Sequence, residues 1–555
     1  MHGRLKVKTT AVQEEEKRIK RQKKLKLFQG ALAAAFKKIH SKEYDPEGLY
    51  ITQEILAANS DYYTIWNYRK NAFLHFKNTK TSDELLKCFQ DELSFLQNCL
   101  KNNPKSYSCW NQRCFVLLTM SDPDWKKELQ LCDLFLQFDD RNFHCWDYRR
   151  FVVQHSAVLP GEEIQFTHKL IENNFSNYSS WHYRSKLLPI ECPDASDKNR
   201  IGEKMLLEEL ELVQNAFFTD PNDQSAWFYH RWLLGRGETK QSLLSLHVSL
   251  LDNKLTCTLR KPASIKDCSR LNVYINDNPH VVVWKGCNQG KYQHVWQSDL
   301  PKKDLFSGEN KIKVEFGSSE LMVEMTGQDE AISCIQTNTE TFRQSSSDAK
   351  LSVLTEELKS CEELNDLEPG NKWVMLTLVL LMRAIDPTHY SSQVHDTLHE
   401  LCTVDGMRQC YYQDLMSKFV IEDHIAAVDL HQRCIDLHGK ALTRVCRFEF
   451  FSTITSLNLS HNQLHSLNSP FKLLHCLQKL DVSENEIVEI SGLKDLTKLV
   501  LLNLDSNKIS SLKTLEPVTT CAALQKISVK SNRIPLEDID SLLQILPNVE
   551  IVYES

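Results

Sequence analysis

A tryptophan followed by an arginine recurs five times in the first 232 residues, usually with a tyrosine between them. Successive tryptophans lie 44, 36, 35 and 46 residues apart. A motif with this period is typical of stacked helical hairpins, so we predict a helical-hairpin solenoid. The repeated pairs are Trp66 and Arg69, Trp110 and Arg113, Trp146 and Arg149, Trp181 and Arg184, and Trp227 and Arg231.

Each hairpin needs two helices, and the sequence supplies both. Asn or Asp precedes most tryptophans, sometimes with Pro directly after it, which suits a helix start. The segment before each motif carries apolar residues three and four positions apart, as an amphipathic helix does. Two such stripes are Leu86, Phe89, Leu93, Leu96 and Leu100, and Leu206, Leu210, Val213 and Phe217. We expect the Trp to be core and the Arg to brace the next hairpin.

After about residue 240 the helical pattern gives way to short strand-like runs separated by turns. The expected strands are 245–258, 271–275, 280–284, 292–297, 311–316 and 321–325. Their number and spacing predict a small β sandwich inserted into the helical domain. Residues 328–350 are polar and read as a return linker. Helices then resume up to about residue 439, and Trp373 repeats the Pro-then-Trp signature without an Arg.

A second repeat follows from residue 454, with the pattern Leu-x-x-Leu-x-Leu-x-x-Asn-x-Leu of leucine-rich repeats. Its asparagines lie 23, 22 and 25 residues apart, at Asn462, Asn485, Asn507 and Asn532. The Leu positions should be core, and the Asn side chains should satisfy turn backbone. Four repeats suit contact with a partner but do not prove it.

Composition favours a cytoplasmic protein of several domains. The chain has 555 residues with 41% hydrophobic content, too long for one core. Eighteen Cys without a Cys-x-x-Cys pair indicate reduced thiols. No run approaches the length of a transmembrane helix. The net charge of −7 gives no reason to expect nucleic acid.

The beginning of the chain is locally basic: residues 1–26 hold ten Lys or Arg against three Glu. Apolar residues follow at helical spacing from Leu25 through Phe28, Leu32 and Phe36 to Ile39. We therefore expect the charges to coat the wet face of a first amphipathic helix. Nuclear targeting by residues 17–24 is an alternative, although such short basic runs are unspecific.

No self-contained catalytic signature is found. The sequence lacks a Gly-x-x-x-x-Gly-Lys loop, a Gly-x-Ser-x-Gly elbow and a His-Glu-x-x-His pair. Its 20 His are scattered without a convincing zinc spacing. The chain is therefore either a scaffold or one part of an active site that another subunit completes.

The repeat run Asn-Pro-Lys-x-Tyr-x-x-Trp-x-x-Arg resembles that of protein prenyltransferase alpha subunits. The opening residues 1–8, Met-His-Gly-Arg-Leu-Lys-Val-Lys, and the two later modules resemble the Rab-modifying branch of that family. The resemblance covers the whole chain. It implies a multidomain, mainly α protein: helical prenyltransferase-alpha repeats at 1–240, an immunoglobulin-like β sandwich at 241–345, further helices at 346–442 and leucine-rich repeats at 443–555.

This resemblance implies an enzyme that transfers geranylgeranyl from geranylgeranyl diphosphate to C-terminal cysteines of Rab GTPases. An escort protein would present the Rab, and an obligate beta subunit would bind the zinc and the lipid. In such a reaction a thiolate attacks an allylic carbon while the charge of the leaving diphosphate is neutralised. The alpha subunit would contribute positive side chains from its hairpin ends.

Motif matching to the family's second and third repeats implies four active-centre residues: Lys105, Tyr107, Asn142 and His144. Lys105 follows Pro104 at an expected helix start, where free backbone amides already favour an anion. His2 is a further candidate, as a ligand reaching the zinc of the partner subunit.

Two other interpretations stay open at this point. A farnesyltransferase or type I geranylgeranyltransferase alpha subunit would share the helical repeats but lack the sandwich and the leucine-rich tail. A non-catalytic helical-repeat scaffold could use the same solenoid to bind a GTPase. Assembly with a zinc-containing beta subunit would distinguish an enzyme from a scaffold.

Overall fold

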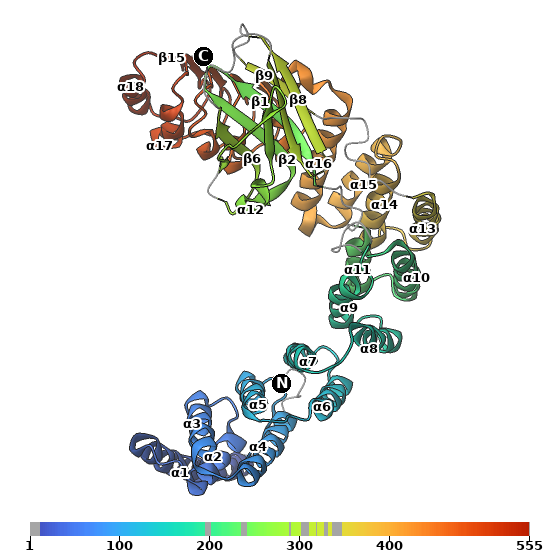
Figure 1. The fold of residues 1–555 in the computed structure, drawn as a ribbon, viewed down its shortest axis with the longest axis vertical. Helices are drawn as coiled ribbons and strands as arrows, with labels where there is room; N and C mark the ends of the chain where they lie inside the picture. The colour runs from blue at the N-terminus through green and yellow to red at the C-terminus, as the bar shows by residue number, and fades with distance from the viewer. Residues whose placement is uncertain are drawn as a thin grey trace. The chain divides into compact units, whose positions relative to one another are not determined.

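A computed structural model describes residues 11–194, 201–234, 241–287, 290–300, 310–317, 319–326, 331–335 and 347–553. The chain divides into two compact units, residues 1–205 and 206–555. The first is helical, and the second combines helices with three β-sheets (Figure 1). None of the described helices is long and apolar enough to cross a membrane.

The first unit is built from hairpins of helices, as the period of the motif predicts. Its helices pair in sequence order, with α4 on α5, α6 on α7 and α8 on α9. Its helices are α1 (Ala11–Ser41), α2 (Pro46–Ala58), α3 (Tyr63–Thr79), α4 (Ser82–Asn102), α5 (Tyr107–Thr119), α6 (Trp125–Phe138), α7 (Phe143–His155), α8 (Pro160–Asn173) and α9 (Tyr178–Glu191).

Side-chain caps fix where several of these helices begin. Thr81 and Glu84 form a reciprocal capping box at the start of α4. Ser106 caps α5, Asn142 caps α7 and Asn177 caps α9, each by accepting from backbone N–H groups of the first turn. In the apolar stripe of α4, Phe89, Leu96 and Leu100 are buried and Leu93 is half-buried, but Leu86 is exposed, in contrast to the expected stripe.

The helical part of the second unit takes in most of α10 (Glu203–Thr219), followed by α11 (Gln224–Leu234). The four apolar residues expected on α10 are buried. Later helices of this unit are α13 (Asp348–Leu367), α14 (Lys372–Ile385), α15 (Ser391–Val404) and α16 (Gln409–Ala427). Helix α14 contacts α11, α13 and α15, so helices on both sides of the β region share one packing unit.

Two antiparallel sheets lie between these helical segments in the sequence. One has the order β5-β6-β2-β1-β9 and the other β4-β3-β7-β8. Apolar residues from both sheets form one buried cluster, which makes the pair a sandwich. The strands are β1 (Leu243–Ser249), β2 (Lys254–Ser264), β3 (Asn272–Ile275), β4 (Asn278–His280), β5 (Lys285–Gly286), β6 (Tyr292–Asp299), β7 (Asn310–Phe316), β8 (Ser319–Met325) and β9 (Ala331–Ile335), with α12 (Ile265–Cys268) after β2.

Three of the expected strand boundaries are wrong. The run 245–258 is a hairpin of β1 and β2, and Asn253 takes a positive φ of 55° in the turn between them. The expected strand 280–284 is not formed: β4 ends at His280, residues 281–284 belong to no strand, and Val281 is fully exposed. Residues 331–335, expected within the polar linker, form β9 on the edge of β1.

The expected leucine-rich pattern forms a six-stranded parallel sheet in the order β10-β11-β12-β13-β14-β15. These strands are β10 (Cys434–Asp436), β11 (Ser456–Asn458), β12 (Lys479–Asp481), β13 (Leu501–Asn503), β14 (Lys526–Ser528) and β15 (Glu550–Val552), with helices α17 (Leu512–Leu515) and α18 (Leu536–Ile545). The repeat leucines are buried in one continuous core.

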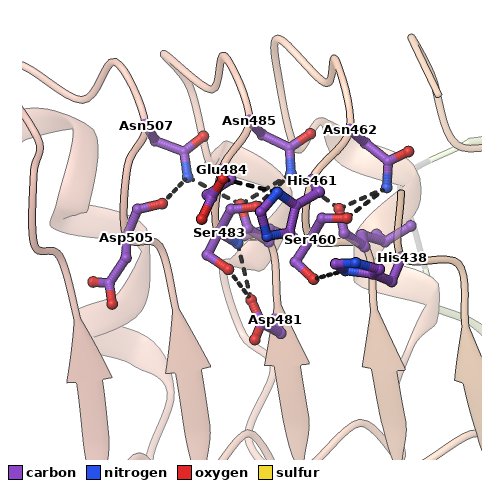
Figure 2. A network of polar contacts seen from close by, with 12 residues as sticks. His438, Ser460, His461, Asn462, Asp481, Ser483, Glu484, Asn485, Asp505 and Asn507 are labelled. Atoms are coloured by element: carbon purple, nitrogen blue, oxygen red, sulfur yellow. Dashed lines mark hydrogen bonds and ion pairs between the residues drawn. The ribbon is translucent and has the colours of Figure 1, made fainter. Parts of the chain in front are cut away.

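The four repeat asparagines, which follow β11 to β14, bond to turn backbone as predicted and so join neighbouring turns. Asn485 accepts a hydrogen bond from the Leu464 N–H at 2.9 Å and donates to the carbonyls of Leu459 and Val482. Figure 2 shows Asn462, Asn485 and Asn507 side by side in this ladder. These hydrogen bonds of the asparagine side chains satisfy buried backbone groups that the short strands leave unpaired.

The sandwich packs against the beginning of the leucine-rich repeats within the second unit. Leu244, Val295 and Ile335 of the sandwich belong to the same buried cluster as the repeat leucines. The Ser452 hydroxyl bonds to Thr258 at 2.8 Å. The two β parts therefore share a core.

Candidate functional site

The five motif tryptophans are all buried, with at most 5% of their surface exposed. Each indole N–H donates to a backbone carbonyl six residues earlier, in the loop that begins its helix. This contact ties the loop to the core. The bonds run from Trp66 to Ser60 (2.8 Å), Trp110 to Pro104 (2.9 Å), Trp146 to Asp140 (2.8 Å), Trp181 to Phe175 (2.8 Å) and Trp227 to Pro221 (3.0 Å).

The same loop carbonyl also receives a bond from the cap residue of the next repeat in three places. The carbonyl of Pro104 accepts from Asn142 Nδ2 at 3.1 Å, in addition to its own tryptophan. Ser106 donates to the carbonyl of Ser60 at 3.2 Å, and Asn371 donates to that of Pro221 at 3.2 Å. One carbonyl thus fixes its own helix start and the next one together.

Three of the motif arginines form buried ion pairs with a glutamate on the following helix. Arg113 makes two bonds of 2.7 Å to Glu128, and Arg149 bonds to Glu163 at 2.6 and 2.8 Å. Arg69 pairs with Glu92 in the same way. Such forked arginine–carboxylate bonds are strongly directional.

Three of the motif arginines also donate to a backbone carbonyl of the preceding helix. Arg69 donates to the carbonyl of Leu49, Arg113 to that of Leu93, and Arg184 to that of Ile164. These three arginines therefore contact the helix before their own, and Arg69 and Arg113 also pair with a glutamate on the helix after it.

The glutamates of these pairs are the residues that motif reasoning missed. Glu128 also accepts the hydroxyl of Tyr148 at 2.6 Å, so one carboxylate serves the arginine of one repeat and the tyrosine of the next. In the second repeat Gln112 replaces the tyrosine and donates to Glu92 at 3.0 Å. A signal was present in the sequence: Glu92, Glu128, Glu163 and Glu209 each stand eighteen residues before a motif tryptophan.

The last repeats depart from the arginine pattern. Three residues after Trp227 stands His230, not Arg231, and its imidazole lies 2.8 Å from the carboxylate of buried Glu357. Arg231 instead lies over the ring of Phe228. In α14 the cap is Asn371, so Trp373 has the position that His144 has in α7 and does not repeat the motif tryptophan.

The four residues predicted for the active centre come together at the starts of α5 and α7. Tyr107 is the first residue of α5, and its ring lies 4.2 Å from the His144 imidazole in an edge-to-face arrangement. Lys105 stands two residues earlier, with its ammonium 3.7 Å from a carboxylate oxygen of Asp139. Tyr107 is 69% exposed and the Lys105 side chain 67%, so both are available to a partner or ligand.

His144 and Asn142 are buried behind this pair. Burial lowers the pKa of His144, and the nearby Lys105 cation lowers it further, against the carboxylates of Asp147 and Asp61. The neutral imidazole is therefore favoured. Asn142 has both ends of its amide engaged: Oδ1 caps α7 and Nδ2 bonds to the α5 loop.

A hollow of about 550 Å³ lies beside Lys105, between the α2–α3 and α4–α5 loops. Asp61 lines it and accepts the Ser106 hydroxyl at 2.6 Å. Lys105 thus projects from a loop that neighbouring repeats hold in place. A cation beside the first turn of a helix can bind an anion together with free backbone amides.

Among the residues that the structure describes, no group of three or more His, Cys, Asp or Glu could hold a metal ion. His2, the candidate for reaching a partner's zinc, lies outside the described residues.

Comparison with known proteins identifies the repeat. Residues 89–120, 125–156, 160–190 and 206–237 match the protein prenyltransferase alpha subunit repeat. The chain is 42% identical to the human geranylgeranyl transferase type-2 subunit alpha over the full length of both, and 40% identical to that of Dictyostelium discoideum over 46% of this chain and 81% of that protein.

Among solved structures, Candida albicans protein geranylgeranyltransferase-I complexed with GGPP is similar to part of the chain. The two are 25% identical, with a TM-score of 0.33, over 38% of this chain and 68% of that one.

Proposed function

The chain belongs to the geranylgeranyl transferase type-2 alpha-subunit family, and we propose that it works with a beta subunit to geranylgeranylate C-terminal cysteines of Rab GTPases. The lipid donor would be geranylgeranyl diphosphate, and an escort protein would present the Rab. The observation that carries this proposal is the full-length similarity to the human subunit, which includes the sandwich and leucine-rich modules. Alpha subunits that consist of helical repeats alone would not match those modules.

Lys105 has the chemistry that a leaving diphosphate requires. Its exposed ammonium stands at the start of α5, where the first-turn amides reinforce its positive potential. As the allylic carbon–oxygen bond breaks, negative charge grows on the diphosphate oxygens, and a fixed cation stabilises that charge. Asp139 at 3.7 Å would orient the ammonium in the absence of the anion.

The other three residues would shape the site around Lys105. Tyr107 presents an exposed phenol against the edge of His144. The lowered pKa of His144 keeps the imidazole neutral, so it does not repel Lys105. Asn142 would act as a positioning residue, because its amide joins the helix starts that carry the other three.

The partner subunit would supply the zinc and the lipid pocket, and this chain would supply the rim. We infer that the sandwich is immunoglobulin-like, since two antiparallel sheets enclose one core, and that it and the leucine-rich repeats are stabilising or interaction modules. The domain limits would lie near residues 240, 345 and 442. We expect the enzyme to act in the cytoplasm.

The first test is the transfer of labelled geranylgeranyl from its diphosphate to a Rab protein. The reaction is run with this chain, a beta subunit and an escort protein, and then with each component left out. Transfer only in the complete mixture supports the proposal. A stable complex without transfer would indicate a scaffold, and transfer to short peptides without the escort would indicate another prenyltransferase class.

Lys105→Ala tests the assigned role of the cation. Losing one charge-stabilising contact should slow single-turnover transfer on the order of 100-fold, with assembly unchanged. Lys101→Ala is the matched control, because Lys101 is also exposed and lies four residues away on α4. Equal rates for both variants would refute the role of Lys105.

A further inference from the structure

The first half of helix α1 stands free of the rest of its unit. All residues from Glu15 to Leu27 are exposed, although they are helical. Packing begins at Phe28, which with Ala31, Leu32 and Ile39 lies against the helical core. Leu25, expected as the first residue of the buried stripe, is 55% exposed. About three and a half turns of helix therefore have no contact that buries them.

This free segment is strongly cationic. Between residues 15 and 26 seven Lys or Arg stand against two Glu. At about 100° per residue, the cations are spread round the whole circumference of the helix. They are Lys17, Arg18, Lys20, Arg21, Lys23, Lys24 and Lys26. The chain as a whole has a net charge of −7, so the positive charge is concentrated at this end of the sequence.

The pattern differs from the amphipathic helix that the sequence predicts. Continuing the buried stripe backward from Phe28 through Leu25 leads to Arg21 and Arg18, so no apolar seam extends along the free segment. Protein interfaces have cores depleted in charge, which this segment cannot offer. Its ligand must instead be a diffuse array of negative charge.

We propose that residues 15–27 of α1 bind the surface of an anionic lipid membrane. Basic residues near a bilayer that contains phosphatidylserine are attracted to its headgroups. Ile19, Leu25 and Leu27 stand exposed among the cations, at 44%, 55% and 76%. At about 100° per residue these three side chains lie on different sides of the helix, so whichever side faces a bilayer presents one of them to the boundary between headgroups and acyl chains. The phosphate backbone of a nucleic acid offers such a side chain no apolar contact.

Such binding would be electrostatic, peripheral and reversible. Each basic residue contributes about a fivefold change in partitioning to an anionic surface. Neutralising four of the seven should therefore weaken binding by roughly 100-fold or more. Added salt should weaken it as well, because it screens exposed charges. The inference does not depend on the proposed transferase activity.

The test is co-sedimentation of the full-length chain, alone and with its beta subunit, with phosphatidylcholine vesicles that contain or lack phosphatidylserine. The test variant replaces four cations with glutamine, a good helix former. The control variant replaces four exposed lysines elsewhere in the first unit. The substitutions are Lys20→Gln, Arg21→Gln, Lys23→Gln and Lys24→Gln, against Lys87→Gln, Lys126→Gln, Lys127→Gln and Lys169→Gln.

We expect salt-sensitive binding to the anionic vesicles only, retained by the control variant and lost by the test variant. Circular dichroism should show equal helicity for both. Three results would overturn the proposal: no binding by the unmodified chain, equal binding by both variants, or a test variant that no longer assembles with the beta subunit. The last would identify an acidic surface of the partner as the occupant. Tighter binding to a short DNA duplex than to vesicles would also overturn it.

Discussion

Replacing Glu128 with glutamine should destabilise the helical solenoid at one defined point. Glu128 is 2% exposed and accepts three hydrogen bonds, two from Arg113 and one from Tyr148. Glutamine has nearly the same shape but no charge, and its NH₂ group would face the N–H and O–H donors of Arg113 and Tyr148 without accepting from them. The buried guanidinium of Arg113 would then have no counter-charge, while its bond to the Leu93 carbonyl remains.

The expected loss is about 3–5 kcal/mol, the usual cost of breaking one side of a buried ion pair. Tyr148→Phe should cost less, about 1–2 kcal/mol, because it removes one hydrogen bond and leaves the Arg113 pair intact. For a unit of about 200 residues, 1 kcal/mol corresponds to roughly 2–4 °C in melting temperature. Glu128→Gln should therefore lower the melting transition of the first unit by about 10 °C.

Hydrogen exchange resolved to peptides of α5, α6 and α7 is the best assay, because a chain of several domains does not unfold in one step. Calorimetry of the same variants gives the melting temperature. Glu54→Gln is the control, since Glu54 is exposed on α2. If the backbone amides of α5, α6 and α7 exchange as slowly in Glu128→Gln as in Glu54→Gln, the Glu128 carboxylate does not hold these helices together.

Two further predictions concern the second unit. Burial lowers the pKa of His247 to about 4, with the Arg433 and Lys498 cations acting in the same direction. Between pH 6.5 and 4 the His247 imidazole is therefore protonated in the unfolded chain but neutral in the folded one, and at pH 5 this difference should lower the free energy of unfolding by about 2 kcal/mol. Stability should thus fall as the pH falls through this range, and thermal unfolding of His247→Gln should show a smaller dependence on pH. Asn485→Ala should cost about 1–3 kcal/mol, because it leaves the buried N–H of Leu464 without a partner, while the carbonyls of Leu459 and Val482 each keep a bond from a neighbouring asparagine. The exposed Asn548→Ala should leave the melting temperature unchanged.

The repeats could be predicted because their periods are long and their anchors rare. Tryptophans at 35 to 46 residues and asparagines at 22 to 25 admit few architectures, and the structure has helical hairpins and a parallel sheet at those places. Short elements gave weaker signals. Strand β9 is five residues long, and its pairing with β1 is a contact between segments some 85 residues apart, which local pattern cannot show.

The sequence also predicts the wrong register for the last helical repeat, because it takes Trp373 for the motif tryptophan. Trp373 follows a proline and looks like the motif, but the cap Asn371 lies two residues before it, whereas Asn142 lies four residues before Trp146. Met375 has the motif position instead, eighteen residues after Glu357. The distance from the cap and the distance from the glutamate agree with each other, so together they define the repeat better than the tryptophan does.

The buried ion pairs of the solenoid explain how a candidate site at the starts of two helices can be held in one geometry. A buried pair adds little net stability, because desolvation offsets the attraction, but its geometry permits one arrangement of the helices. Arg113 joins α4, α5 and α6, and the Pro104 carbonyl joins the starts of α5 and α7. A displacement of one hairpin would therefore break several directional bonds at once. The positions of Lys105 and His144 thus depend on buried carboxylates and loop carbonyls elsewhere in the repeats.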